Sequence, residues 1–410
     1  MLNTDQLNAC TQYVLERARF VIESFGPRPP GSDAERKTQE LVRAELEVCC
    51  DGEVTFEEFP VAQKAFFSMQ AIGGVLTLAA IGAYWAHPAA ALALMVAAAT
   101  VMYFQLLRYR LFLDPFFPKK PSYNVAGRQS PVSAVKRRII LNGHPDAAYE
   151  WRFNYLAPKW FPLIVLYTLI GLIVMLAGSA IATIAVFAMP ASSETLVRVV
   201  GWVLALFVPA GILGILFNNL AVVAPGANDN LSGTFIATGI LKYLRESGAH
   251  LQHTELMAVI TGSEEAGLRG AKVWAQRHKR ECEDVETIVL ALDTFRDLPH
   301  LTIYNRDMNG VVAHDEDVSQ LLKRAAIAAG HNLPFGTIYL GSSDGAAFTQ
   351  AGFRTGMLGG MDPRPAHYYH NRRDTWEIMD AACIRATIEV LLETIRQFDE
   401  QGLIKETSSM

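Results

Sequence analysis

Residues 137–147 read RRIILNGHPDA and place a His and an Asp directly after a short apolar run. The first six of these residues are rich in apolar and β-branched side chains, and turn-forming residues follow them. A short apolar run bounded in this way predicts a buried β-strand. His144 and Asp146 are therefore expected just beyond the end of a strand.

Further strands of this kind alternate with amphipathic helices in the rest of the chain. The expected strands are residues 255–260, 287–292, 301–304 and 355–358. The expected helices are residues 231–247, 268–280, 319–330 and 381–399. This alternation predicts an α/β fold with a mostly parallel central sheet and helices on both faces. Sheets of this type bind ligands beyond the carboxyl ends of their strands.

Side chains that can bind metals gather at those expected strand ends. They are His144, Asp229, Glu264, Glu265, Asp293 and His370. Each one alone has a structural explanation, because Asp residues often cap helices, paired acids often lie in solvated turns and most His residues are structural. Together, two His and several carboxylates form the ligand set expected for two divalent ions.

The same residue types suit hydrolysis. A carboxylate that bridges two ions, with one His and one further carboxylate on each, leaves both ions open to a shared water that loses a proton near neutral pH. A carboxylate that binds no metal can then act as general base, and Glu264 and Glu265 supply one acid for each task. Asp146 is placed to accept the second imidazole N–H of His144 and so to fix its tautomer.

Two long uncharged blocks interrupt the α/β pattern. Residues 66–107 contain no Asp, Glu, Lys or Arg, and neither do residues 160–193 and 199–228. A transmembrane helix needs about 20 apolar residues. We therefore expect four spans, arranged as two hairpins, at residues 66–85, 88–107, 161–188 and 199–222. The alternative is a set of buried core helices, which rarely stay uncharged over such lengths.

The two hairpins divide the chain into segments that are expected to fold together. Residues 1–65, 108–159 and 223–410 would form one soluble domain, with hairpins at 66–107 and 160–222. Each hairpin returns the chain to the side that it left, and basic residues flank the spans on that side: Lys64, Arg108, Arg110, Lys119, Lys120 and Lys159. The positive-inside rule predicts that this face is cytoplasmic.

Composition excludes several classes of function. Of 410 residues, 51% are hydrophobic and 19% are charged, and the formal net charge is −5. The slightly acidic balance argues against a nucleic-acid-binding protein, and the apolar content excludes a disordered chain. Five Cys without a CxxC pair suit a reducing compartment. The lipid bilayer is an expected partner, and the oligomeric state is open.

The motifs follow one another in the order of a known enzyme family. They are FGPRPPGS (25–32), SYNV (122–125), RRIILNGHPDA (137–147), PGANDNLSG (225–233), TGSEEAGLRG (261–270), ALD (291–293) and YYHNRRDT (368–375). This series resembles the M28 family of metallopeptidases, the co-catalytic zinc aminopeptidases, over nearly all of the expected soluble domain. The inserted hairpins depart from that resemblance.

The resemblance implies a ligand set for two zinc ions per chain. Asp229 would bridge the ions. His144 and Asp293 would complete one site, and Glu265 and His370 would complete the other. The same ligands also accept Mn²⁺ or Co²⁺, so the native metal is open.

The resemblance also implies catalytic roles. Glu264 would be the general base that takes a proton from the water bridging the metals and passes it to the leaving amine. Tyr369 would hydrogen-bond the tetrahedral oxyanion, although a packed aromatic at this position is an equal alternative. The segment from Ser343 to Phe348 would line the substrate pocket, but the His that the family usually has after Asp344 is Gly345 here.

The resemblance implies a dinuclear zinc exopeptidase, in which a metal-bridging hydroxide attacks a peptide substrate, and it favours an aminopeptidase. The expected spans add membrane anchoring to this prediction. A glutaminyl-cyclase-like transferase would use a single zinc. A non-catalytic M28-like receptor or scaffold would lack a ligand or the base. A transporter would need charged groups within its spans. The peptide preferred, and the choice between amino-, carboxy- and dipeptidase, are open.

Overall fold

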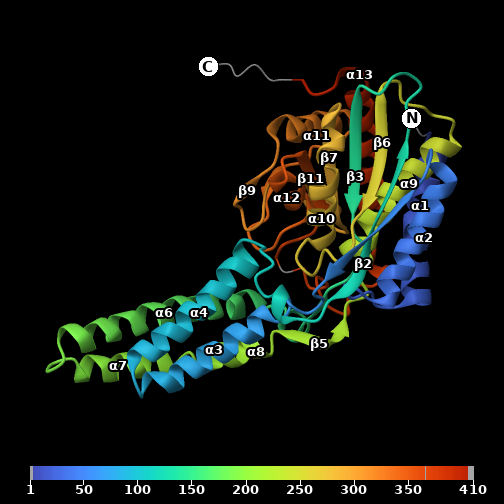
Figure 1. Ribbon diagram of the computed structural model, residues 1–410. Coiled ribbons are helices and arrows are strands. Elements are labelled where there is room, and N and C mark those ends of the chain that lie inside the picture. Colours follow the sequence, from blue (N-terminus) through green and yellow to red (C-terminus); the bar gives the residue numbers. More distant parts are fainter. Residues whose placement is uncertain (1–2, 365, 405–410) are drawn as a thin grey trace. The chain divides into compact units, whose positions relative to one another are not determined.

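The computed structural model describes residues 3–364 and 366–404, and it divides into two compact units (Figure 1). Unit 1 comprises the chain up to Gln63, Lys119–Ala148 and the chain from Val223 onward. Unit 2 comprises Lys64–Pro118 and Tyr149–Val222. Each unit is therefore discontinuous in sequence.

Unit 1 contains a nine-stranded sheet in the order β1-β2-β6-β3-β7-β11-β8-β10, with β9 paired to β8. Its strands are β1 (Thr55–Val61), β2 (Lys120–Gln129), β3 (Arg137–Gly143), β6 (Thr254–Ile260), β7 (Glu286–Phe295), β8 (Leu301–Asp307), β9 (Val312–Ala313), β10 (Phe335–Thr337) and β11 (Arg354–Gly360). The central strands β6, β3, β7 and β11 run parallel, and β2 and β8 flank them antiparallel. β1 pairs antiparallel with β2 at the outer edge. The five strands that the sequence predicts are confirmed as β3, β6, β7, β8 and β11.

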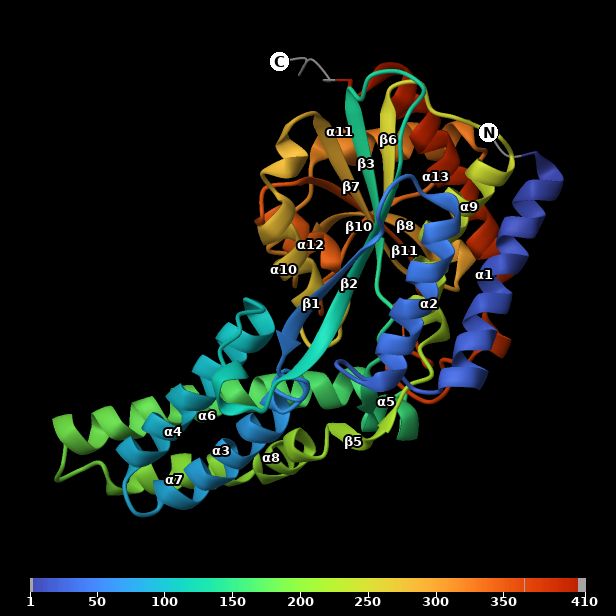
Figure 2. The same ribbon diagram turned by 45° about the vertical axis from the view of Figure 1, so that its right-hand side comes forward.

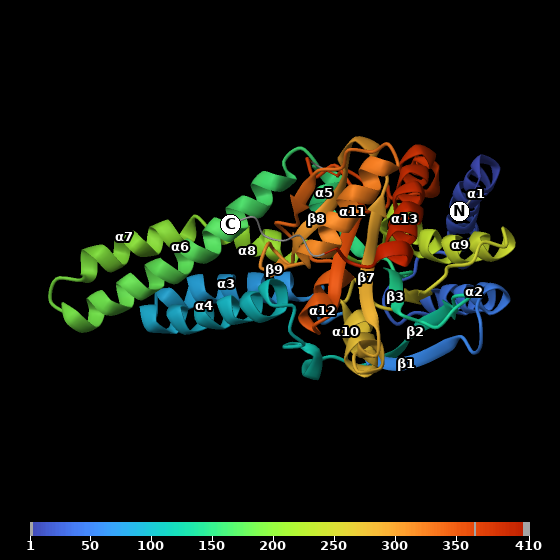
Figure 3. The ribbon, with the colours of Figure 1, turned by 90° about the horizontal axis from the view of Figure 1, so that it is seen from above.

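Helices cover both faces of this sheet, as the alternation of strands and helices predicts. α1 (Thr4–Phe25), α2 (Asp33–Cys49), α9 (Ser232–Glu246), α11 (Glu316–Ala328) and α13 (Ala381–Gln401) lie on one face, and α10 (Arg269–His278) and α12 (Asp344–Gln350) lie on the other (Figure 3). Ile139, Ile140 and Leu141 are consecutive in β3 and all fully buried. A strand covered on both faces reads as a continuous apolar run.

Unit 2 is mainly helical (Figure 2). Its helices are α3 (Met69–Tyr84), α4 (Pro88–Met102), α5 (Arg152–Leu156), α6 (Phe161–Ala188), α7 (Glu194–Ala205) and α8 (Val208–Ile215), and β4 (Tyr149–Trp151) pairs with β5 (Asn218–Val223). A π-helical turn, η1 (Tyr103–Leu107), continues α4, and a 3-10 turn, η2 (Asp114–Phe116), follows it. Large apolar side chains face outward from α6, because Ile173, Ile184 and Phe187 are 67%, 65% and 71% exposed.

Glycines allow α3 and α8 to approach closely. A Cβ atom added to Gly74 would lie 2.4 Å from the carbonyl oxygen of Gly211, and one added to Gly214 would lie 3.0 Å from that of Gln70. Small residues at such contacts let helix backbones pack tightly, as they do in membrane bundles.

In the part of the chain that the structure describes, three helices are long and apolar enough to cross a membrane, rather than the four that the sequence predicts. They are Pro88–Leu107, Phe161–Ala188 and Glu194–Ile215, and between 22% and 28% of each apolar window is buried. The expected span at residues 66–85 is shorter, because α3 begins only at Met69 and has 16 residues. In place of the expected span at 199–222, the structure has the helix Glu194–Ile215, which begins earlier. It also ends earlier, because β5 starts at Asn218.

Candidate metal centre

The ends of adjacent parallel strands bring the predicted metal ligands together. His144 follows β3, Glu264 and Glu265 follow β6, and Asp293 lies near the end of β7. Because β6, β3 and β7 are neighbours and parallel, these side chains share one edge of the sheet. His370 comes from the segment between β11 and α13.

Asp229 reaches the same edge from the π-helical turn η3 (Ala227–Leu231), which leads into α9. The Asp229–Asn230 peptide bond is cis. Asn230 fixes this turn to β7, because its Nδ2 donates to the carbonyl of Leu292 at 2.7 Å. Gly233 is required directly after the turn, since a Cβ there would lie 2.5 Å from the same carbonyl oxygen.

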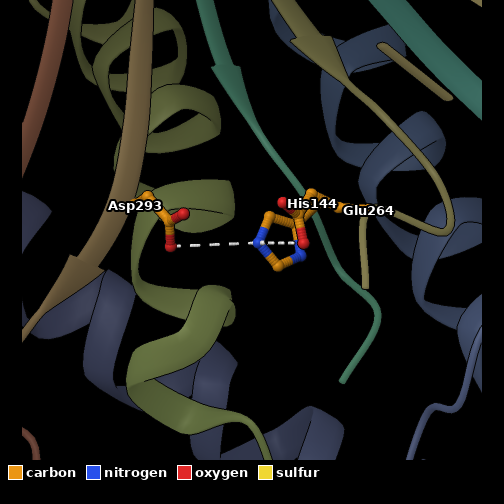
Figure 4. Close-up of side chains that lie close together, drawn as sticks. All are labelled: His144, Glu264 and Asp293. Carbon is orange, nitrogen blue, oxygen red and sulfur yellow. Dashed lines mark ion pairs between the residues drawn. The ribbon is translucent and has the colours of Figure 1, made fainter. Parts of the chain in front are cut away.

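The first group of potential ligands consists of His144, Glu264 and Asp293 (Figure 4). His144 Nε2 lies 3.7 Å from Glu264 Oε2 and 3.9 Å from Asp293 Oδ1. It also lies 3.7 Å from Asp229 Oδ1. The ligand atoms of the group lie within 4.8 Å of one another, which leaves space for one cation among them.

The second group consists of Asp229, Glu265 and His370. His370 Nε2 lies 3.1 Å from Asp229 Oδ2 and 3.3 Å from Glu265 Oε2. The two oxygens of Asp229 thus face different histidines, Oδ1 toward His144 and Oδ2 toward His370. This is the arrangement that a carboxylate bridging two ions requires.

Asp146 contacts the backbone beside the metal ligands as well as the imidazole of His144. Its Oδ1 lies 3.3 Å from His144 Nδ1, as an orienting partner for that imidazole should. Its two carboxylate oxygens also accept the backbone N–H groups of Glu264 and Glu265, each at 3.0 Å. Asp146 therefore sets the position of the expected base and of one expected ligand together.

Glu35, which the sequence did not single out, holds the residue just before that pair. Its carboxylate is fully buried and accepts the backbone N–H of Ser263 at 2.6 Å through Oε1 and that of Gly31 at 2.6 Å through Oε2. In the sequence, Glu35 is part of a Ser32-x-x-Glu35 spacing, which is typical of a helix N-terminus. Nothing local in that spacing indicates a contact with a turn 228 residues away.

Arg28 and Asp374 fix the loops that carry His144 and Asp229. Arg28 is fully buried and donates to the carbonyls of Pro145 at 2.6 Å and Gly226 at 2.9 Å. Asp374 accepts the backbone N–H groups of Asn228 and Asp229 at 3.0 and 3.1 Å. Both residues belong to motifs that carried the family resemblance, but their partners lie too far away in sequence to be identified from it.

Tyr369 lies beside the second group. Its ring stacks on that of His370, with centroids 3.9 Å apart. Burial, and then the negative charges of Asp229 and Glu265, raise the pKa of its hydroxyl well above the usual value. A protonated hydroxyl at this place is able to donate a hydrogen bond, as the expected role at an oxyanion requires. That role stays a prediction.

Phe348 does not line a pocket as the resemblance implied. It is fully buried, and its ring packs against those of Trp274 and Phe353 at 5.8 and 5.6 Å. It is therefore a core residue beneath the sheet. Asp344, at the start of the same helix, is buried and hydrogen-bonded to the hydroxyl of Thr261.

The electrostatics of the cluster call for cations. Burial raises the pKa of Glu264, Glu265 and Asp293 above the usual range, and repulsion among the neighbouring carboxylates raises each pKa further. Burial alone would lower the pKa of His144, but Glu264, Asp146 and Asp293 raise it well above the usual value. Divalent ions between these side chains would offset both the burial and the repulsion.

The donor set fits divalent metal ions. Within the described chain, His144 Nε2 and Glu265 Oε1 are buried and have no hydrogen-bond partner. Buried polar atoms without a partner are costly and call for an explanation such as a bound ion. Two His and four carboxylates, grouped as they are here, match the ligands that zinc accepts.

Comparisons with known proteins concern the family and the fold of the chain. Residues 214–395 match the sequence profile of Peptidase family M28. No curated protein sequence matches the chain significantly.

Among solved structures, the aminopeptidase from Aneurinibacillus sp. strain AM-1 is similar with a TM-score of 0.57 and 13% identity, over 96% of this chain and 95% of that one. A zinc aminopeptidase from Bacillus subtilis has a TM-score of 0.55 and 13% identity, over 95% of each chain. A glutaminyl cyclase from an Acidobacteriales bacterium has a TM-score of 0.56 and 15% identity, over 96% of this chain and 95% of that one. At such identities these likenesses concern the fold. Residues 214–395 are thus similar to Peptidase family M28, as the motifs predict, and the fold is similar to that of solved zinc aminopeptidases.

Proposed function

We propose that this protein is a membrane-anchored metallopeptidase with two zinc ions, and that it removes N-terminal residues from peptides. The observation that carries the proposal is the placement of Asp229 between two ligand groups. One of its oxygens faces His144 and the other faces His370. Asp293 and Glu265 complete the two expected sites. Glu264 lies within the first ligand group, and we assign it the role of acid and base.

Zinc ions bound there would supply Lewis acidity that polarises the scissile carbonyl and acidifies water. Glu264 accepts the proton of the attacking water and later donates it to the nitrogen of the leaving amine as the C–N bond breaks. Asp146 holds Glu264 through its backbone N–H, which keeps the base beside the ligands. The Tyr369 hydroxyl donates a hydrogen bond to the oxygen of the carbonyl as negative charge develops on it.

Glutaminyl cyclase chemistry is the second candidate, because a glutaminyl cyclase has nearly the same TM-score as the aminopeptidases. The complete second ligand group of Asp229, Glu265 and His370 favours two ions over the single zinc expected for a cyclase. Metal content therefore separates the two candidates.

The apolar helices support anchoring in a membrane. β1 pairs with β2 over all of its own residues, so the chain between the two strands must leave and return on the same side of a membrane. If α4 and its continuation Pro88–Leu107 cross, α3 must cross as well. At 1.5 Å per residue, its 16 residues span about 24 Å, a mismatch that local thinning of the bilayer can accommodate. We propose four crossings on this ground, with unit 1 in the cytoplasm because basic residues flank the spans on its side.

The decisive test is metal content and substrate choice of the detergent-purified chain beside Glu264→Gln. We expect about two zinc ions per chain in both proteins, and cleavage of peptides with a free N-terminus but not of N-acetylated ones by the wild type. Glu264→Gln should lose at least about 100-fold in kcat and keep its metal. The exposed Glu53 in the turn before β1 provides a matched control, Glu53→Gln, which should behave as wild type.

Other outcomes identify the alternatives. About one zinc ion with release of ammonia from N-terminal glutamine would establish the cyclase. A folded chain with no bound metal and no turnover of either substrate would leave a receptor or scaffold as the function.

A further inference from the structure

A hollow of about 400 Å³ lies where the chain leaves the helix Pro88–Leu107. Its lining consists of Tyr103, Phe104, Arg108, Arg110, Leu111 and Phe112. The chain turns back after η1, and the backbone N–H of Arg110 donates to the carbonyl of Phe104 at 2.8 Å. The rings of Phe104 and Phe112 stack with centroids 5.3 Å apart. The walls of the hollow are therefore fixed by hydrogen bonding and ring stacking.

A buried polar side chain also stabilises this turn. Gln105 is fully buried, and its Oε1 accepts the backbone N–H of Leu113 at 3.3 Å. This contact ties the returning chain to η1, while the Nε2 of Gln105 is buried without a hydrogen-bond partner among the described residues. The hollow is thus part of the fold rather than an accidental gap between loops.

Two positive charges border this apolar hollow. Arg108 and Arg110 are both exposed, and among the residues that the structure describes neither side chain has an ion pair or a hydrogen bond. The acid that lies nearest along the chain, Asp114, is buried and not part of the lining. Guanidinium groups match phosphate geometry closely and bind it readily. Two guanidinium groups that form no ion pair, beside aromatic rings, favour a ligand with both an anionic and an apolar part.

The position of the hollow along the chain indicates which ligand that is. Arg108 directly follows a 20-residue apolar helix. If that helix crosses the bilayer, the arginines and the aromatic rings lie at the depth of the lipid headgroups, where basic and aromatic residues are enriched. The apolar surface for acyl chains is also present, because Val96, Leu107 and Leu111 are 50%, 45% and 51% exposed.

We propose that this hollow binds one anionic glycerophospholipid, with its phosphate between Arg108 and Arg110 and its acyl chains along α4. The proposal rests on the membrane anchoring proposed above. A zwitterionic lipid would bring its ammonium group close to the two guanidinium groups, so repulsion disfavours it. The site would hold the end of the first hairpin at the surface of an anionic leaflet.

Native mass spectrometry of the full chain in mild detergent tests the site, with dioleoylphosphatidylglycerol and dioleoylphosphatidylcholine as probes. We expect one phosphatidylglycerol to bind at least about 10-fold more tightly than phosphatidylcholine. Arg108→Gln combined with Arg110→Gln should weaken phosphatidylglycerol binding roughly 30-fold and leave phosphatidylcholine binding unchanged. The matched control removes the same charge from exposed residues outside the hollow, as Lys119→Gln with Lys120→Gln, and should change binding less than about 3-fold.

Three results would overturn the proposal. The first is equal binding of the two lipids by the wild type. The second is unchanged phosphatidylglycerol binding by the double arginine variant, provided that it melts at the wild-type temperature. The third is displacement of phosphatidylglycerol by millimolar inorganic phosphate, which would indicate a site for soluble anions. Extraction of the chain from membranes by alkaline carbonate is measured in parallel and would overturn the anchoring itself, whereas retention in the membrane together with any of the three results would overturn the lipid site alone.

Discussion

Glu35 shows how single residues at a distance determine the geometry of the candidate metal centre. Both of its carboxylate oxygens accept backbone N–H groups, one from Ser263 and one from Gly31. Asp146 accepts the next two N–H groups along the chain, those of Glu264 and Glu265. Three consecutive backbone donors are therefore held by two buried acids. The expected base cannot shift without breaking at least one of these hydrogen bonds.

Replacing Glu35 with Gln tests this role at the residue scale. An amide can present only one acceptor oxygen, so its NH₂ group must face one of the two backbone donors. We expect the free energy of unfolding to fall by about 1–3 kcal/mol and peptidase activity to fall with it, measured by urea unfolding and by kcat of the zinc-loaded chain.

The control lies on the exposed face of the same helix. Glu40 forms a surface ion pair with Arg36, so Glu40→Gln should cost less than about 0.5 kcal/mol. If Glu35→Gln were as stable and as active as Glu40→Gln, the positioning role of Glu35 would be wrong.

At the scale of elements, the contact between α3 and α8 depends on the absence of side chains. A Cβ at Gly74 would lie 2.4 Å from the Gly211 carbonyl and 2.8 Å from the backbone nitrogen of Ile215. Neither of these backbone atoms can move without displacing a helix. The close packing of the short α3 against α8 therefore limits which substitutions unit 2 tolerates.

Gly74→Ala is accordingly expected to destabilise unit 2 by about 1–3 kcal/mol, seen as a lower melting temperature in detergent. Gly82 in the same helix is the matched control, because nothing lies within 4 Å of a Cβ added there. Gly82→Ala should be neutral or stabilising by up to about 1 kcal/mol, since alanine favours helices. Equal melting temperatures for the two variants would contradict the close approach.

At the scale of the whole molecule, the pairing of β1 with β2 restricts the topology of the chain. The strands are hydrogen-bonded in register from Thr55 with Ala126 to Val61 with Lys120. If the chain between β1 and β2 crosses a membrane, it must therefore cross an even number of times. The turn at His87, between α3 and α4, should therefore lie across the membrane from unit 1.

Labelling with a membrane-impermeant maleimide checks this topology. In intact cells, His87→Cys and Ser192→Cys should react, whereas Ser130→Cys in unit 1 should react only after lysis. The native chain serves as background, because four of its five Cys are buried. Reaction of all three positions under the same condition would show that the helices do not cross.

The metal-free chain should lose stability as the pH rises. Burial raises the pKa of Glu35 to about 8 and that of Asp344 to about 7. Both acids bind protons more tightly when folded than when unfolded, so their contribution is fully present below about pH 4 and is lost as the pH rises through about 7 to 8. Between the unfolded pKa of about 4 and its folded pKa, each acid is expected to lower the free energy of unfolding by about 1.4 kcal/mol per pH unit.

Urea unfolding of the chelator-treated chain at about pH 5 and about pH 8 measures this effect. Asp344→Asn removes one of the two acids and should reduce the slope. Addition of zinc should weaken or reverse the dependence on pH, because metal ligands must be deprotonated to bind. A metal-free chain that becomes more stable toward pH 8 would refute the expected linkage.

The sequence by itself determined the elements and the chemistry of the candidate centre. Apolar runs followed by polar residues predicted β3, β6 and β7, because a strand buried on both faces has a pattern that depends only on its neighbours in sequence. The same local spacing placed His144, Asp229, Glu264, Glu265, Asp293 and His370 at strand ends, and the structure brings them into two groups. Long uncharged runs likewise predicted the apolar helices.

Only the tertiary structure decided which residues support these groups and where the helices end. Glu35, Arg28 and Asp374 act through contacts with chain segments more than 100 residues away, and such pairings depend on how the strands are ordered in the sheet. The expected span at 66–85 is a helix of 16 residues, because the chain forms turns up to Ser68 and the helix begins only at Met69. Hydropathy measures whether a residue tolerates an apolar environment. It does not measure which backbone groups are hydrogen-bonded, and that depends on the folded chain.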